Sequence, residues 1–341
     1  MIKSVKNKNL FLSYAALAFV YTYAGIAEKY PDYNGNALLT WFFTAACALV
    51  YSFAVSKFFS TDFVKKDGGK APLVLLLTFC ILYASSNVSF FASSLGLFDD
   101  FYSSETCVFF AAFFSLFCAF FIGKRGKNGI IFFGLLSSVF FFAWTFFGFF
   151  AFFTAKHAVL ISSPLKLLEK TDFFGIIKDI LYINADLAVF AYVLSKNEST
   201  PEKQTLKAAI PAGSAFFAAV SGANVLKNAL LLGDRLLYEA ENPNFTAIRM
   251  IPLFELPEIC VAVNAFACII KASVSVCCAF FALKDIYGEK YNGKIAPFLL
   301  FGAAFASALL ICGRDGVTEF LSVTSAVACA ALCFFVRYKN V

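Results

Sequence analysis

Charge is scarce in this chain. Only 15% of its 341 residues are charged, whereas 60% are hydrophobic and the mean hydropathy is +0.77. Soluble globular domains carry about 25% charged residues. Because backbone polar groups within lipid must be satisfied inside each crossing segment, long apolar runs of this kind predict an all-α polytopic protein embedded in a lipid bilayer.

Histidine and paired cysteine motifs are also lacking. His157 is the single histidine, and none of the 11 cysteines forms a CxxC pair. A cysteine and histidine metal site is therefore not expected, and neither is a cofactor. No nucleophile and base pair stands out, so we do not expect an enzyme. The excess of basic residues falls in loops between apolar runs, which does not suggest nucleic-acid binding.

Hydropathy predicts ten spans. They cover Leu10–Ala27, Ala37–Ser60, Ala71–Leu95, Glu105–Gly123, Gly129–Thr154, Asp172–Ser195, Leu206–Gly233, Glu255–Leu283, Ile295–Cys312 and Val317–Arg337. Placing both termini in the cytoplasm puts most of the 28 lysines and arginines in inner loops. Every even-numbered span then exits onto a basic loop, which agrees with the positive-inside rule.

The eighth predicted span carries Lys271 near its centre, followed by Ser273 and Ser275. A lysine in the middle of a membrane helix costs about 2.5 to 3.5 kcal/mol on insertion scales. Such a residue normally faces a bundle interior, a partner or a water-filled path. We therefore expect Lys271 to belong to a functional site.

The sixth predicted span contains two acids. Asp179, Tyr182 and Asp186 recur at i, i+3 and i+7, which places them on one helical face, and Asn184 lies beside them. An intramembrane acid is a functional-site hypothesis by default. For Asp179, a position at the outer interface beside Lys178 is an equally good interpretation.

Two further segments admit two interpretations each. The motif Tyr23-Ala24-Gly25-Ile26 near the end of the first span is either a discontinuous helix that contacts a ligand or a site of close helix packing. In the third span, the cluster around Ser86 and Asn87 either lines a ligand site or supplies hydrogen bonds between helices.

The chain resembles the spore germination permeases, the membrane-embedded B subunits of GerA-type nutrient germinant receptors. The best-matching stretch is Asn242–Gly288, with a proline-led outer segment, an acid-bearing helix start, the run IIKASVSV and a charged, glycine-ended turn. Weaker matches are the spacing of Gly25, Pro31 and Trp41, the Glu105-Thr106 start of the fourth span and the turn Gly123-Lys124-Arg125-Gly126.

This family belongs to the amino acid-polyamine-organocation transporter superfamily, whose fold is two inverted five-helix repeats with helices 1 and 6 broken (LeuT-like). The resemblance implies a single membrane domain with repeats at about 10–154 and 172–338. It implies a ligand pocket lined by Tyr23, Ala24, Gly25, Ile26, Ser86, Asn87, Asn184, Asp186 and Asn264. It also implies a cation or proton-coupling site at Lys271, Ser273, Ser275 and Asp179.

By this resemblance the chain is a germinant receptor subunit in the spore inner membrane. It would bind a small nutrient, expected to be an amino acid, and act with A-type and C-type receptor subunits. Two alternatives remain open at this point: a proton-coupled amino acid permease, and an ion-conducting or scaffold subunit.

Overall fold

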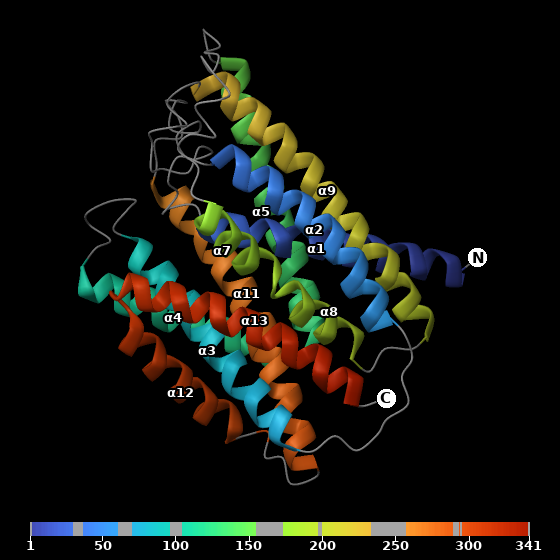
Figure 1. Ribbon diagram of the computed structural model, residues 1–341, viewed down its shortest axis with the longest axis vertical. Coiled ribbons are helices and arrows are strands. Elements are labelled where there is room, and N and C mark those ends of the chain that lie inside the picture. The colour runs from blue at the N-terminus through green and yellow to red at the C-terminus, as the bar shows by residue number, and fades with distance from the viewer. Residues whose placement is uncertain are drawn as a thin grey trace.

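The computed structural model describes residues 2–29, 37–60, 70–95, 104–154, 173–196, 200–232, 257–288, 293 and 295–339, and every regular element in these ranges is a helix. The helices are α1 (Ile2–Lys29), α2 (Ala37–Ser60), α3 (Lys70–Ser94), α4 (Glu105–Lys124), α5 (Lys127–Thr154), α7 (Phe173–Asn184), α8 (Leu187–Ser195), α9 (Thr200–Leu232), α11 (Pro257–Tyr287), α12 (Ala296–Ile311) and α13 (Asp315–Lys339). Figure 1 shows them as one elongated bundle. The start of the stretch that carries the family resemblance, residues 242–256, lies outside the described residues.

Five of these helices are long and apolar enough to cross a membrane. The qualifying segments are Phe42–Ser60, Lys70–Ser94, Glu105–Lys124, Val261–Tyr287 and Gly316–Val336. Shorter apolar helices occur at Lys127–Ala143 and Ala296–Ile311. Large apolar side chains such as Phe132 and Phe298 are 72% and 76% exposed, as expected for residues that face lipid. The prediction of an all-helical protein is therefore confirmed for the described residues, and five of the ten predicted spans coincide with helices long and apolar enough to cross a membrane.

Helix α11 forms the centre of the bundle. Its apolar window is 83% buried, against 33–61% for the other four helices of spanning length. It packs on α1, α3, α4, α5 and α8, and in Figure 1 it runs through the middle of the molecule. Lys271, halfway along α11, is consequently surrounded by protein on all sides and is 0% exposed.

Helices α3 and α12 are joined by serines at four-residue spacing. Ser85 Oγ donates to the carbonyl oxygen of Ala304 (3.0 Å) and Ser89 Oγ to that of Ala308 (2.7 Å). Ser93 Oγ lies 3.5 Å from Cys312 Sγ, one further turn along. Since residues four apart lie on one helical face, these side chains form a continuous seam between two helices. This part of the polar cluster in the third span therefore serves helix packing.

Helix α1 is continuous from Ile2 to Lys29, so the break expected at Tyr23-Ala24-Gly25-Ile26 does not occur. One glycine costs a helix only about 1 kcal/mol relative to alanine, which is too little to interrupt an otherwise apolar, proline-free helix. The glycine instead provides space. A Cβ atom on Gly25 would lie 2.7 Å from Lys271 Nζ and 3.2 Å from the Ile183 carbonyl oxygen.

The sixth predicted span is interrupted, as expected, and forms the separate helices α7 and α8. Residues 185 and 186 form a turn between them. Here Ala188 N donates to Ala185 O, three residues back, at 3.3 Å. Helical bonding resumes when Phe190 N donates to Asp186 O at 3.0 Å. The interruption places two helix ends, one of each polarity, in the interior of the bundle.

Candidate ligand site at a buried ion pair

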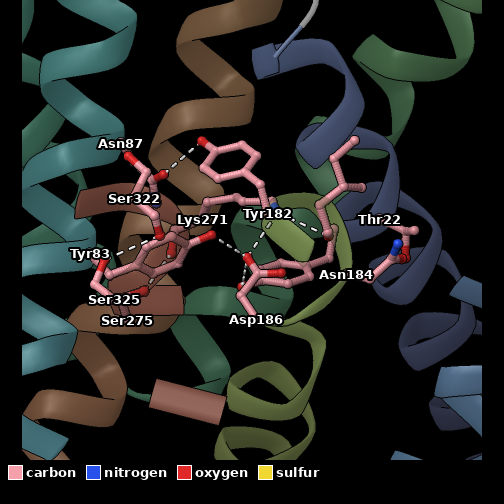
Figure 2. Close-up of polar contacts among 12 residues, drawn as sticks. Thr22, Tyr83, Asn87, Tyr182, Asn184, Asp186, Lys271, Ser275, Ser322 and Ser325 are labelled. Carbon is pink, nitrogen blue, oxygen red and sulfur yellow. Dashed lines mark hydrogen bonds and ion pairs between the residues drawn. The ribbon is translucent and has the colours of Figure 1, made fainter. Parts of the chain in front are cut away.

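Asp186 and Lys271 form an ion pair inside the bundle. The N-cap of α8 is Asp186, and its Oδ2 atom lies 2.8 Å from Lys271 Nζ, with both side chains 0% exposed (Figure 2). Sequence analysis singled out both residues separately. The structure brings them together because α8 packs against α11 at the helix interruption.

Two tyrosines complete the surroundings of the carboxylate. Tyr21 of α1 and Tyr83 of α3 each donate a hydroxyl hydrogen bond to Asp186 Oδ2, at 2.8 Å and 2.6 Å. Figure 2 labels Tyr83 and Asp186. With Lys271, one oxygen therefore receives three donors from three different helices. Hydrogen bonds to a charged group are about twice as strong as neutral ones, so this arrangement fixes the position of the carboxylate.

The lysine is held by oxygen atoms and by aromatic faces. Its Nζ lies 3.5 Å from the carbonyl oxygen of Ile183, in the last turn of α7. It lies 5.2 Å from the ring centroid of Tyr21 and 5.7 Å from that of Tyr182. Carbonyl groups at a helix C-terminus and the faces of aromatic rings both attract cations.

The helix interruption also reduces the cost of burying these two charges. Moving an ion pair out of water is unfavourable unless the geometry is good and further hydrogen bonds satisfy the remaining groups. Asp186 lies at the N-terminus of α8 and Lys271 faces the C-terminus of α7. Each charge therefore meets the helix end of opposite polarity, which a continuous helix would not provide.

Several buried polar atoms close to this centre have no hydrogen-bond partner among the described residues. They are Asp186 Oδ1, Asn184 Oδ1 and Asn87 Nδ2, while Asn264, on the same face of α11 as Lys271, has neither amide atom paired. The other atoms of Asn87 and Asn184 are used: Tyr182 donates to Asn87 Oδ1 (2.9 Å), and Asn184 Nδ2 donates to Ile180 O (3.0 Å). Buried polar groups are nearly always hydrogen-bonded, so each of these unpaired atoms has a free bonding position for water or for a polar ligand.

Other residues predicted for the site lie in different surroundings. Tyr23 packs its ring against Phe141 of α5, with centroids 5.2 Å apart, and Ala24 is buried beside it in α1. Ser86 donates to Tyr83 O, one turn earlier in its own helix (3.0 Å). The side chains of Ile26 and Asp179 lie outside the described part of the structure.

The two serines that follow Lys271 are also satisfied within α11. Ser273 Oγ donates to Ile269 O (2.6 Å) and Ser275 Oγ donates to Lys271 O (3.2 Å). Ser273 lies two residues from Lys271 and therefore about 200° around the helix, where its backbone faces Gly123 of α4. The structure thus groups Lys271 with Asp186 and the tyrosines, and not with Ser273.

Tyr21 and Tyr83 are the site residues that sequence analysis did not select. A tyrosine within an apolar run is usual in a membrane protein, so residue type alone gives no signal. Their spacing does carry one, since Tyr21 lies four residues before Gly25 and Tyr83 four residues before Asn87. Each shares a helical face with a position that had been selected.

The polar groups at this centre suit an organic ligand better than a metal ion. In the described part of the chain, no group of three or more histidine, cysteine, aspartate or glutamate side chains could hold a metal ion. The centre offers one carboxylate, one ammonium group, phenol hydroxyls and amides, which together match a ligand that carries both charges. In comparisons with known proteins, no family model matches the chain and no curated protein is significantly similar to it.

Proposed function

We propose that this chain is the membrane-embedded, ligand-binding subunit of a spore nutrient germinant receptor, and that it binds an amino acid at the α7–α8 interruption. The observation that carries the proposal is the Asp186 carboxylate. One of its oxygens receives three donors, and the other, equally buried, receives none from the described residues. A fixed acceptor of this kind suits the ammonium group of an amino acid.

The ligand's carboxylate would meet side chains and not backbone amides. In a continuous α1, the N–H groups of Ala24, Gly25 and Ile26 lie inside the helix and donate to carbonyls four residues back. The available donors are Asn87 Nδ2, Asn264 Nδ2 and the ammonium group of Lys271. An amino acid would thus lie beside the ion pair, with its ammonium group at Asp186 Oδ1 and its carboxylate at these donors.

The membrane arrangement that we propose has ten spans, with α7 and α8 as the two halves of the sixth and both termini in the cytoplasm. The interrupted sixth span agrees with the LeuT-like repeat, whereas the continuous α1 departs from it. Ligand binding would bias the position of α7 and α8, and A-type and C-type partner subunits in the spore inner membrane would respond.

A binding experiment tests the proposal directly. The full chain in lipid nanodiscs would be titrated with each of the common amino acids in radiolabelled form. We expect saturable binding of at least one of them, and binding at least about tenfold weaker for Asp186→Asn, because a charge-assisted hydrogen bond is lost. Ser273→Ala is the matched control, since the Ser273 hydroxyl donates to its own helix.

Two outcomes would contradict the proposal: no amino acid binds to the purified chain, or Asp186→Asn binds with the affinity of the unmodified chain. Lys271→Met and Asn264→Leu should also weaken binding if the ligand's carboxylate lies between these residues. In spores, the same variants should lower germination in response to the amino acid that binds.

A proton-coupled amino acid permease is the second candidate. It is favoured by the fully buried carboxylate inside the helix bundle, because acids within membrane helices commonly mark substrate and ion pathways. Uptake of the labelled amino acid into proteoliposomes that contain this chain alone would establish the permease. Binding without uptake, together with germination that requires the partner subunits, would establish the receptor.

A further inference from the structure

A second candidate site is a cleft between α2 and α9, which shares no residue with the ion pair. Its volume is about 450 Å³, and its walls include Phe53, Ala54 and Lys57 from α2 and Gln204 and Lys207 from α9. This volume lies within the range of about 300–1,000 Å³ that is typical of small-molecule sites. The cleft is therefore large enough to hold a phosphate-bearing group together with part of an attached chain.

The charge in this cleft is entirely positive. Lys57 and Lys207 both line it and no acid does, and neither lysine forms an ion pair within the described residues. Lys196 shows the contrast, because it is paired with Asp285 of α11. Two unpaired lysines facing one cleft attract an anion.

The cleft also has apolar walls, which include Phe53, Ala54 and Ala208. Phe53 lies one turn before Lys57 in α2 and is 59% exposed, in the helix segment long and apolar enough to cross a membrane. Gln204 adds an exposed amide that can bond to a hydroxyl or a phosphate oxygen. A charged end with an adjoining apolar surface matches one phospholipid molecule, with its headgroup at the lysines and its acyl chain along Phe53.

We propose that this cleft is a binding site for an anionic phospholipid of the inner leaflet, with its phosphate held between Lys57 and Lys207. In the topology proposed above, the end of α2 and the start of α9 face the cytoplasm, where anionic lipids are attracted to basic residues. The site does not depend on amino acid binding at Asp186, because it shares no residue with that centre.

Native mass spectrometry of the detergent-purified full chain, titrated with phosphatidylglycerol, tests this site. We expect one phosphatidylglycerol molecule to be retained more tightly than phosphatidylcholine. The double variant Lys57→Gln/Lys207→Gln should raise its apparent Kd about tenfold or more, whereas Lys57→Arg/Lys207→Arg should retain it. The matched control is Lys70→Gln/Lys124→Gln, which removes the same charge from exposed positions on α3 and α4.

Three results would overturn the proposal. The first is unchanged retention of phosphatidylglycerol by Lys57→Gln/Lys207→Gln. The second is an equal loss in Lys70→Gln/Lys124→Gln, which would mean that only net charge matters. The third is displacement of the lipid by millimolar inorganic phosphate, which would assign the cleft to a soluble anion. None of these three results depends on whether the chain binds an amino acid at Asp186.

Discussion

Within the described residues, helices α7 and α8 and their flanking residues take part in three ion pairs whose surroundings differ. At one end, Lys178 pairs with Glu319 of α13 at 2.7 Å, and the two side chains are 34% and 30% exposed. At the other end, Lys196 pairs with Asp285, and these side chains are 17% and 41% exposed. Between them, Asp186 and Lys271 are 0% exposed. Lysine–carboxylate ion pairs therefore occur in both partly exposed and fully buried positions along α7 and α8.

The difference shows what a buried pair requires. A partly exposed pair keeps some contact with water and needs fewer further partners, and exposed pairs contribute about 0–1 kcal/mol. Lys196 has Tyr192 in addition, whose hydroxyl accepts from Nζ at 3.3 Å, and the ring of Phe281, whose centroid lies 5.2 Å from Nζ. The central pair has Tyr21, Tyr83 and two helix ends around it. Its supporting groups replace the water that both charges have lost.

The largest expected effect is the loss of one member of the central pair. Lys271→Met leaves the Asp186 carboxylate buried without its counter-charge, which should lower the free energy of unfolding by about 3–5 kcal/mol. Thermal unfolding of the purified chain in detergent would measure it. The double variant Asp186→Asn/Lys271→Met should recover most of the loss, because no buried charge remains. If Lys271→Met unfolds at the temperature of Lys178→Met, the two environments are energetically equivalent and the contrast is wrong.

Removal of one supporting hydroxyl should have an intermediate effect. Tyr83→Phe keeps the ring and deletes the 2.6 Å donor to Asp186 Oδ2. A hydrogen bond to a charged group contributes about 1.5–3 kcal/mol, so stability should fall by that amount. Tyr287→Phe is the control, since Tyr287 is 56% exposed at the end of α11 and should change stability by less than about 0.5 kcal/mol. Equal shifts in the two variants would mean that the Tyr83 hydroxyl does not support the carboxylate.

The close approach of α1 to Lys271 predicts that two glycine-to-alanine substitutions have opposite effects on stability. Gly25→Ala places a methyl group 2.7 Å from Lys271 Nζ, and overpacking of this kind costs about 1–3 kcal/mol. Gly222→Ala in α9 meets nothing within 4 Å and should stabilise by up to about 1 kcal/mol through helix propensity alone. Chemical denaturation of both variants in the same detergent measures the two effects. Stabilisation by both substitutions would show that Gly25 does not provide space for the lysine.

The all-helical class could be predicted from the sequence, because backbone polar groups within lipid must be satisfied inside each segment. Long apolar runs separated by charged loops predict helices, and Ala37–Ser60 was predicted with the bounds that α2 has. The interruption near Asp186 was implied by the resemblance to a family with a broken sixth helix, and it falls where Asn184 and Asp186 occur within an apolar run. These signals are local and belong to one segment of the chain.

The sequence did not predict in the same way which side chains contact one another in the site. Periodicity gives the face of a helix but not the helix that it meets, so Tyr21 and Tyr83 could not be assigned to Asp186. The error at Gly25 has a related cause. A glycine allows both unwinding and close packing, and only the position of Lys271 against α1 decides between them.

The smallest expected effect concerns the pair at the exposed end of α7. Lys178→Gln removes an ion pair whose members are each about one-third exposed, so stability should fall by about 0.2–1 kcal/mol and the loss should shrink at high salt. A double-mutant cycle with Glu319→Gln isolates the coupling energy, which we expect within the same range. A coupling as large as that of Asp186 with Lys271 would mean that exposure does not set the strength of these pairs. The supporting groups around the central pair would then need another explanation, and ligand positioning by the two tyrosines would be the first one to test.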